Sequence, residues 1–394
     1  GMKNTEKNHQ NQAYGSHMLY FDPFYWRKTE KGLSGELKNY PGITVNADGS
    51  IHVMFYAPGA GSVVLTGIGG HMQGKLKGEF PLARCTQEEK KGYWETVLSG
   101  IKPGFHYHRY LVDGKEMLNT IAPVGFGCGE AINFFEVPDP DFEEYLLSDV
   151  PHGTVRMELF PSSVTGRTRC CWVYTPPGYD DGKKEYPLLF LQHGGGENEC
   201  GWIWQGKINY IMDNLLATGA CREMIVVMSC GDYYKEQEDG TYTAVDMDEI
   251  LTRDCLPFIE KRYRALGRRE ARACAGLSLG GTYARRVVFR HPETFCCLGM
   301  FSSGAGFQVK GTELDMPYDY TKLFEDPENY NEEMKLTFIS CGEQDFRIEY
   351  TRPQVKELTD RGFHIEFHTY PGYHEWDVWR KSAADMIRRL FVWL

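Results

Sequence analysis

Apolar segments bounded by turn residues characterise the second half of the chain. They cover residues 187–192 and 271–276, and further strands are expected at 335–341 and 364–370. A helix is expected at 282–290, and helical spacing also precedes the last strand. Strands that alternate with helices along the chain are typical of an α/β domain with a mostly parallel central sheet.

The first third of the chain has a different pattern. Residues 51–56 alternate between apolar side chains on one face and a mixed set on the other. Turns at Asp48-Gly49, 59–61 and Asp113-Gly114 separate short strands at a spacing of roughly 10 to 15 residues. Short alternating strands with regular turns predict a smaller all-β sandwich domain.

The length of 394 residues also suggests two domains, because one compact core rarely grows to this size. We place a linker where proline and acidic residues interrupt both patterns. The predicted organisation is an N-terminal extension at 1–35, a β-sandwich at 36–138, a linker at 139–150 and an α/β domain at 151–394.

The composition limits the kinds of molecule that the protein is expected to bind. Hydrophobic residues make up 42% and charged residues 25% of the chain, as in an ordinary soluble globular protein. The formal net charge of −11 argues against binding to a phosphate backbone. No segment approaches the ~20 consecutive apolar residues that a membrane span needs. We therefore expect neither nucleic acid nor membrane as a partner, and the oligomeric state, a homo-oligomer included, stays open.

The twelve cysteines favour free thiols over disulfides or a metal site. No C-x-x-C pair is present, and Cys230, Cys274 and Cys341 lie in apolar strands, where free cysteine behaves as a small hydrophobic residue. The N-terminal residues are polar and lack the apolar segment of a secretory signal. Both observations predict a reducing, cytoplasmic location. The alternative is a chain from which a signal peptide has been removed, and the cysteines argue against it.

The segment G-x-S-x-G at 276–280 places Ser278 between a strand and a helix. A serine on so sharp a turn has its hydroxyl exposed above the sheet, and the flanking glycines avoid clashes with neighbouring elements. This context predicts a nucleophile. The alternative is a Gly/Ser turn that only closes a βα unit.

A nucleophilic serine needs a base and an acid, which follow in the order Ser, Asp/Glu, His in α/β-hydrolases. Asp345 and His374 both come just after strands, at the sheet edge where Ser278 lies and where ligands bind in open α/β sheets. Glu343 and Glu349 are rival acids, and the G-x-x-D spacing favours Asp345. Three other histidines are expected to be structural: His291, His364 and His368.

The segment His193-Gly194-Gly195-Gly196 follows the strand at 187–192. Two backbone N–H groups must stabilise the negative charge of a tetrahedral intermediate. The residue after the nucleophile, Leu279, supplies one, and a glycine-rich loop after an early strand supplies the other. The alternative is a flexible loop without this role.

The second half of the chain resembles a known family. The resemblance to carbohydrate esterase family 1, a group of α/β-hydrolases with feruloyl and acetyl xylan esterases, rests on residues 189–199, 201–202, 205–207, 275–281 and 372–380. It covers roughly 149–394 and implies an α/β-hydrolase fold that needs no metal or organic cofactor. It also implies these roles: nucleophile Ser278, base His374, acid Asp345, oxyanion donors Gly195 and Leu279.

The N-terminal region resembles an early-set, immunoglobulin-like domain of the type found in glycogen-branching enzymes. The residues that carry this resemblance are 43–58, 62–66, 92–98 and 103–114. Trp94 lies in one of these segments and is expected in the sandwich core rather than on a sugar-binding surface. The domain is expected to act mainly as a packing partner.

The motifs predict a serine esterase. The resemblance implies that it hydrolyses feruloyl or acetyl esters of plant-type carbohydrates, with a small-molecule or oligosaccharide ester as substrate. Aromatic residues on loops at the active edge are candidates for substrate binding, with packing as the alternative: Trp202, Trp204 and Tyr234. One alternative function is an enterochelin-type siderophore esterase, although no basic cluster for a catecholate is evident. Another is a non-catalytic carbohydrate-binding protein with a degenerate hydrolase domain.

Overall fold

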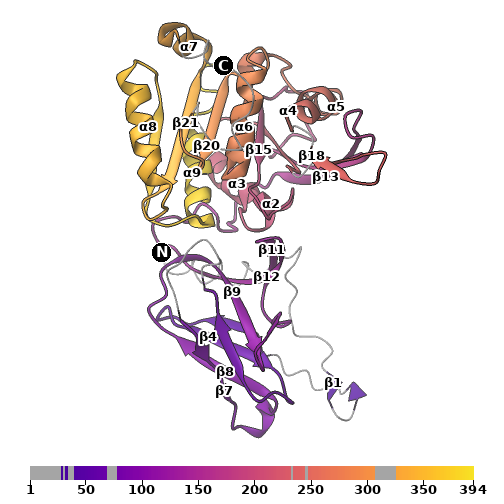
Figure 1. Cartoon of the computed structure of the whole chain (residues 1–394), viewed down its shortest axis with the longest axis vertical. Coiled ribbons are helices and arrows are strands. Elements are labelled where there is room, and N and C mark those ends of the chain that lie inside the picture. Colours follow the sequence, from indigo (N-terminus) through magenta and orange to yellow (C-terminus); the bar gives the residue numbers. More distant parts are fainter. Residues whose placement is uncertain are drawn as a thin grey trace. The chain divides into compact units, whose positions relative to one another are not determined.

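The computed structural model describes residues 28–29, 32–33, 40–68, 78–231, 234–244, 247–306 and 325–394. The chain divides into two compact units, residues 1–147 and 148–394 (Figure 1). The division falls within the segment 139–150 that the sequence suggests as a linker. Each unit has its own sheets and its own hydrophobic core.

The first unit consists of antiparallel strands in two main sheets. The four-stranded sheet has the order β3 (Ile43–Val45), β4 (Ile51–Tyr56), β8 (Tyr93–Leu98), β7 (Ala83–Arg84). The other has the order β11 (Val124–Gly127), β12 (Glu130–Val137), β9 (Gly104–Val112), β5 (Val63–Thr66), β6 (Phe80–Pro81), with β10 (Lys115–Met117) also paired to β9. The described part of this unit also includes a short hairpin, β1 (Lys28–Thr29) and β2 (Gly32–Leu33), and a 3-10 helix at Glu88–Lys90.

The core of this unit follows the alternation in the sequence. Ile51, Val53 and Phe55 on β4 are all buried in it, as the period of two predicts. Trp94 is buried as well, and its indole N–H donates to the carbonyl oxygen of Ala57 at 2.9 Å. Trp94 is therefore a core residue, as expected, and the region is all-β.

The second unit is built on one eight-stranded sheet. Its order is β13 (Thr154–Pro161), β14 (Thr168–Thr175), β16 (Ile225–Ser229), β15 (Leu188–Gln192), β19 (Arg272–Leu277), β20 (Cys297–Phe301), β21 (Leu336–Gly342), β22 (Glu366–Tyr370). The first two strands pair antiparallel, and the strands from β16 to β22 run parallel. This is the mostly parallel sheet of an α/β-hydrolase that the sequence predicts.

Helices lie on both sides of this sheet (Figure 1). They are α2 (Gly201–Trp204), α3 (Ile208–Ala217), α4 (Met247–Ile250), α5 (Leu256–Arg262), α6 (Leu279–Arg290), α7 (Pro327–Glu333), α8 (Ile348–Asp360) and α9 (Trp376–Arg389). A π-helical segment at Leu251–Cys255 joins α4 to α5, a 3-10 helix at Arg269–Ala271 precedes β19, and a hairpin is formed by β17 (Tyr234–Glu236) and β18 (Tyr242–Ala244). Helix α3 contacts α9, and α4 contacts α6.

Helix α6 begins three residues earlier than the hydrophobic pattern predicts. The strand β19 ends at Leu277 and the helix starts at Leu279, so a single residue, Ser278, makes the whole turn. The parallel strands all end at one edge of the sheet, which brings the turn after β19 beside the segments that follow β15, β21 and β22.

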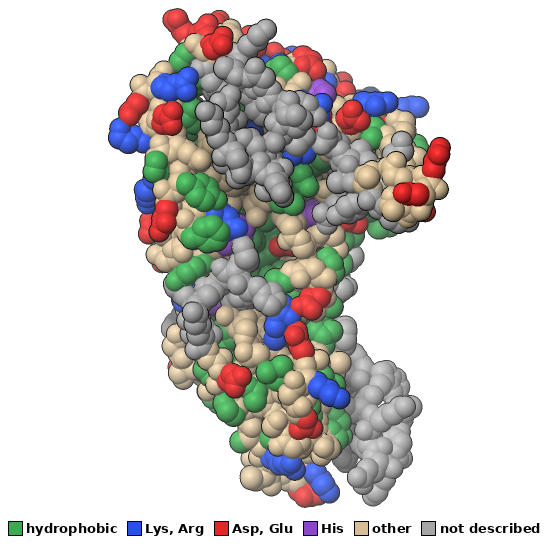
Figure 2. All heavy atoms as spheres, viewed as in Figure 1, with side chains coloured by type: hydrophobic (Ala, Val, Ile, Leu, Met, Phe, Trp, Pro, Cys, Tyr) green, Lys and Arg blue, Asp and Glu red, His purple; other side chains and the backbone are tan. Residues whose placement is uncertain are grey.

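The visible surface carries charged side chains of both signs. Lys and Arg side chains are interspersed with Asp and Glu side chains on the face that Figure 2 shows. None of the described helices is long and apolar enough to cross a membrane. All twelve cysteines are free thiols, as the sequence predicts.

Candidate active site

Ser278 is held in a strained conformation at the sharp turn after β19. Its φ of 50° and ψ of −124° are rare for a residue with a side chain. A Cβ atom at Gly276 would lie 2.3 Å from the carbonyl carbon of Gly280, and one at Gly280 would lie 2.3 Å from the backbone oxygen of His193. Only glycine fits at these two positions, so G-x-S-x-G is a packing requirement of the turn.

Two hydrogen bonds hold the turn against the neighbouring strand. The Ser278 N–H donates to the carbonyl oxygen of Phe301 at 2.7 Å. The hydroxyl of Ser303 donates to the carbonyl oxygen of Ser278, also at 2.7 Å. The strained conformation is therefore stabilised from β20 and the residues that follow it.

His374 lies within hydrogen-bond distance of Ser278. Its Nε2 is 2.9 Å from the Ser278 hydroxyl, and its Nδ1 is 2.8 Å from Oδ2 of Asp345. The rings of Trp379 and His374 form a T-shaped pair, with centroids 5.0 Å apart and the planes at 90°. His374 and Asp345 are 7% and 2% exposed. The structure thus brings the three predicted residues into one hydrogen-bonded chain.

The loops that carry acid and base pack against each other. The Gln344 N–H donates to the carbonyl oxygen of Gly372 at 2.9 Å, and the Gln344 side chain accepts from the Gly372 N–H. The Tyr373 N–H donates to the Glu375 carboxylate at 2.9 Å. These bonds fix the imidazole relative to the carboxylate before any substrate binds.

The environment favours an ionised acid and a neutral base. Burial opposes ionisation of Asp345, but the hydrogen bond from His374 and the charge of Arg347 outweigh it, so the pKa of Asp345 is lowered. Burial lowers the pKa of His374, and the positive charge of Arg347 lowers it further, against the opposing effect of Asp345. With Asp345 ionised, Nδ1 of His374 carries a proton and Nε2 is left to accept one from Ser278.

The rival acids lie elsewhere. Glu343 is exposed and accepts a hydrogen bond from Thr369 at 3.2 Å, and Glu349 is exposed on α8. His291, one of the histidines that the sequence predicts to be structural, lies 3.0 Å from an Asp248 oxygen. None of these groups replaces a member of the Ser278–His374–Asp345 chain.

The glycine-rich loop packs against the serine turn. A Cβ atom at Gly194 would lie 2.6 Å from a side-chain carbon of Leu277 and 3.2 Å from Cβ of Ser278. Gly195 is exposed, and a Cβ atom there would be 3.9 Å from the side chain of Leu279. The two segments predicted to supply the oxyanion donors therefore adjoin at the serine.

His193 anchors this loop. The Gly231 N–H donates to Nε2 of His193 at 2.8 Å, so the proton of the neutral ring is on Nδ1, which donates to the carbonyl oxygen of Gly194 at 2.7 Å. Glu197, four residues further along, is 6% exposed, and its Oε2 has no hydrogen-bond partner among the described residues. Burial raises the pKa of Glu197 well above its ordinary value.

The prediction that Trp202 contacts substrate is wrong. Its side chain is 1% exposed, its indole N–H donates to the carbonyl oxygen of Gln192 at 2.8 Å, and it packs edge-to-face on Trp376. Trp202 is therefore a core residue beneath the glycine loop. Trp204 is half-buried and stays a prediction, and the side chain of Tyr234 lies outside the described residues.

The sequence alone did not identify Arg347. Its backbone N–H and its Nη1 each donate to Oδ1 of Asp345 at 3.0 Å. A signal was present, because an arginine two residues after a predicted acid in a short loop is close enough to pair with it.

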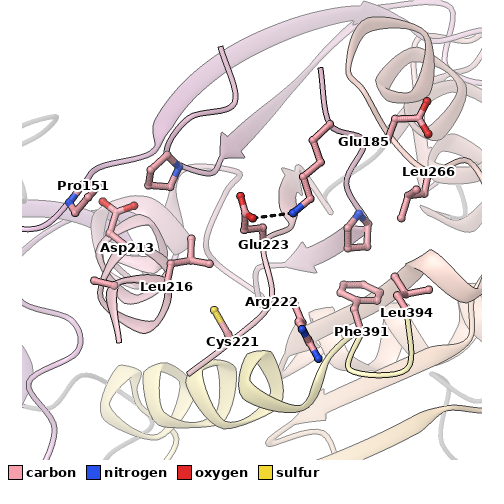
Figure 3. Close-up of a pocket in the computed structure, with 14 residues that line it drawn as sticks. Pro151, Glu185, Asp213, Leu216, Cys221, Arg222, Glu223, Leu266, Phe391 and Leu394 are labelled. Atoms are coloured by element: carbon pink, nitrogen blue, oxygen red, sulfur yellow. Dashed lines mark hydrogen bonds and ion pairs between the residues drawn. The ribbon is translucent and has the colours of Figure 1, made fainter. Parts of the chain in front are cut away.

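A separate cavity lies at the other edge of the sheet. It has a volume of about 550 Å³ and adjoins the residues that lead into β15 and β16 (Figure 3). Lys184 and Glu223 form an ion pair of 2.8 Å at its wall. Asp213 also lines it, and accepts hydrogen bonds from the Gly153 N–H and the Tyr174 hydroxyl. The lining includes no member of the Ser278–His374–Asp345 chain, so the cavity does not belong to this site.

The described part of the chain holds no cluster of three or more His, Cys, Asp or Glu side chains suited to a metal ion. The site itself offers a hydroxyl, an imidazole, a carboxylate and backbone N–H groups.

Comparisons with known proteins find esterases. An endo-1,4-beta-xylanase/feruloyl esterase of Xylanibacter ruminicola is 32% identical over 93% of this chain, which spans 48% of that protein. Among solved structures, a ferulic acid esterase of Anaeromyces mucronatus in complex with ferulic acid is 21% identical, with a TM-score of 0.52 over 62% of this chain and 93% of its own.

A second solved structure covers both units of the chain. The enterobactin esterase of Shigella flexneri is 15% identical, with a TM-score of 0.61 over 86% of this chain and 92% of its own. At this identity the likeness shows the fold alone. A family model described as "Putative esterase" matches residues 162–390, more than half of the chain. The chain belongs to this esterase family.

Proposed function

We propose that this protein is a serine esterase that hydrolyses feruloyl or acetyl esters of plant-type carbohydrates. The observation that carries the proposal is the hydrogen-bonded chain from Ser278 through His374 to Asp345, at 2.9 and 2.8 Å. It lies beside the glycine loop, where a Cβ atom at Gly195 would be 3.9 Å from the side chain of Leu279. A nucleophile, a base and an orienting acid in this order carry out acyl transfer.

The proposed reaction has two halves. His374 takes the proton of Ser278 as the hydroxyl oxygen attacks the ester carbonyl, and Asp345 stabilises the imidazolium that forms. The N–H groups of Gly195 and Leu279 stabilise the oxyanion, each worth about 3 kcal/mol by comparison with single donors in other enzymes. His374 then protonates the leaving alcohol. Water, deprotonated by His374, attacks the acyl-enzyme, and His374 returns the proton to the Ser278 oxygen as the acid leaves.

The choice of substrate rests on a relative. The Xylanibacter ruminicola protein carries feruloyl esterase in its name and is 32% identical over nearly the whole chain. The chain spans about half of that protein, and the family match is to an esterase. A feruloyl or acetyl ester on a sugar fits both the name of this relative and the match to an esterase family.

The test is hydrolysis of p-nitrophenyl acetate and methyl ferulate by the whole chain and by Ser278→Ala. We expect the variant to fold, by circular dichroism, and to lose at least about 10⁴-fold in kcat. Retained turnover in Ser278→Ala would remove the serine from the mechanism. Binding of oligosaccharide by the unmodified chain without turnover of any ester would instead favour the non-catalytic alternative.

A siderophore esterase is the second candidate function, and one observation favours it. The enterobactin esterase structure matches 86% of the chain, both units included, whereas the ferulic acid esterase matches 62%. Parallel assays with methyl ferulate, acetylated xylo-oligosaccharides and a catecholate trilactone separate the candidates. The highest kcat/KM on the trilactone would overturn the carbohydrate assignment.

We also propose that the enzyme works in a reducing compartment, the cytoplasm. The support is the twelve free thiols, most of them buried or half-buried. Fractionation of the source cells tests this, and recovery of the protein outside the cytoplasm would overturn it.

A further inference from the structure

Each oxygen of the Asp345 carboxylate has its own set of donors. Oδ2 accepts from Nδ1 of His374 at 2.8 Å. Oδ1 accepts from both the backbone N–H and Nη1 of Arg347, each at 3.0 Å. Rotation of the carboxylate away from His374 would break the bonds on both sides. Arg347 therefore fixes the plane in which Asp345 meets the imidazole.

The guanidinium of Arg347 is itself held in place. Its central carbon lies 4.4 Å from the ring centroid of Phe346, the residue between it and Asp345. The Arg347 side chain is 15% exposed while Phe346 is 64% exposed, so the aromatic ring is the more exposed of the two side chains. A cation with little access to water is screened less and acts more strongly on a nearby carboxylate.

We propose that Arg347 is a positioning residue of the triad: it orients the Asp345 carboxylate and sets the lower pH limit at which His374 acts as a base. The inference rests on the proposed function, since it assigns a role within the same reaction. Arg347 touches neither Ser278 nor the imidazole in the contacts described, so it acts through Asp345.

Among the described residues that face the acid and the base, Arg347 is the source of positive charge. Burial raises the pKa of Cys341, at the end of β21, to about 12 and also raises the pKa of Tyr350 on α8, so both are neutral near pH 7. Glu375, which follows the base, has one carboxylate oxygen bonded to the Tyr373 N–H. In the part of the chain that the structure describes, two charged groups affect the pKa of His374: Asp345, which raises it, and Arg347, which lowers it.

The sign of the effect follows from these opposing charges. Removing the cation leaves Asp345 alone to stabilise the imidazolium, so the pKa of His374 rises. His374 is then protonated, and inactive as a base, at a pH where the unmodified enzyme still works. A purely structural arginine would change stability and leave the position of this acidic limb where it was.

The test is the pH dependence of kcat/KM on p-nitrophenyl acetate for Arg347→Gln, Arg347→Leu and Arg347→Lys. The leucine variant keeps apolar contact with Phe346 and guards against a variant that fails to fold. We expect the acidic limb of the Gln and Leu variants to move up by about 0.5 to 1 pH unit. The lysine variant keeps the charge but not the planar fork, so its limb should stay in place while its plateau falls several-fold.

Arg352 on α8, the helix that Arg347 precedes, supplies the matched control. Its guanidinium lies 5.9 Å from the ring of Phe367, and it is exposed. Arg352→Gln should leave both limb and plateau unchanged. An unshifted limb in folded Arg347→Gln or Arg347→Leu overturns the inference, and so does an equal shift in Arg352→Gln. Ser278→Ala tests the triad separately, and we expect it to be inactive at every pH whatever the Arg347 variants show. An active Ser278→Ala would overturn the triad assignment rather than the role of Arg347.

Discussion

Gly342 lies directly against the backbone of Gly372, although 29 residues separate the acid Asp345 from the base His374 that these glycines precede. A Cβ atom at Gly342 would come within 2.5 Å of the backbone oxygens of both Gly372 and Tyr373. The close approach lets the loop after β21 pack on the loop after β22. The distance between carboxylate and imidazole is therefore set by backbone contact as well as by the hydrogen bond itself.

Gly342→Ala should separate the acid from the base. The new methyl group meets backbone oxygens, which cannot move aside as a flexible side chain can, so the two loops must shift apart. We expect kcat to fall by about 10²-fold, because misplacement by about 1 Å costs this much. The assay is ester hydrolysis with a thermal melt. Gly182→Ala is the control, since its Cβ would lie 3.4 Å from the nearest atom; an equal loss there would remove the explanation.

Asp345→Asn should retain the fold and lose most of the activity. The amide keeps the shape of the side chain but no longer stabilises an imidazolium, and it favours the wrong tautomer of His374. We expect kcat to fall by about 10⁴-fold, the size seen in another Ser–His–Asp triad. Glu343→Ala should be far milder, because Glu343 is exposed and bonded to Thr369. Comparable losses in the two variants would mean that the acid has been misassigned.

The triad was predictable because each of its members is tied to the end of a parallel strand. Ser278, Asp345 and His374 follow β19, β21 and β22, and strand ends gather at one edge whatever the surrounding side chains are. The two-domain organisation was also predictable. Hydrophobic residues recur with a period of two in one part of the sequence and with helical spacing in another part.

Other features depend on contacts that the sequence does not report. The sequence suggests Trp202 as a substrate contact on a loop at the active edge, but the short helix α2 turns it inward to bond the end of β15. The contact of Arg347 with Asp345 depends on the rotamer of one side chain in a loop. Neither follows from periodicity, because loops obey no hydrophobic pattern.

The acidic limb of the pH profile should lie below the ordinary range for histidine. His374 works as a base only when neutral, and burial lowers its pKa from 6.5. Since a lowered pKa leaves the neutral form populated at lower pH, activity should persist below pH 6.5 and decline further down. The measurement is kcat/KM on p-nitrophenyl acetate from about pH 4 to 8. A limb centred above 6.5 would contradict the burial argument.

Trp202→Phe should affect stability rather than substrate binding. The change removes the indole N–H that bonds the Gln192 carbonyl and part of the contact with Trp376. We expect the free energy of unfolding to fall by about 1 to 3 kcal/mol, as for a lost buried hydrogen bond with its cavity. Urea unfolding and KM for methyl ferulate give the two readouts. A large rise in KM with unchanged stability would restore the original interpretation of Trp202 as a substrate contact.

Glu197→Gln should become more stabilising, relative to the unmodified chain, as the pH rises. Burial raises the pKa of Glu197 in the folded state, so the folded protein keeps a proton that the unfolded chain releases above about pH 4.5. For such a group, stability is fully present below the unfolded pKa and is lost as the pH rises toward the folded one, by up to about 1.4 kcal/mol per pH unit. Glutamine carries no such proton. Urea unfolding of both proteins at about pH 5 and pH 8 measures the difference, and a difference that stays constant or shrinks with pH would mean that Glu197 is ionised in the folded state.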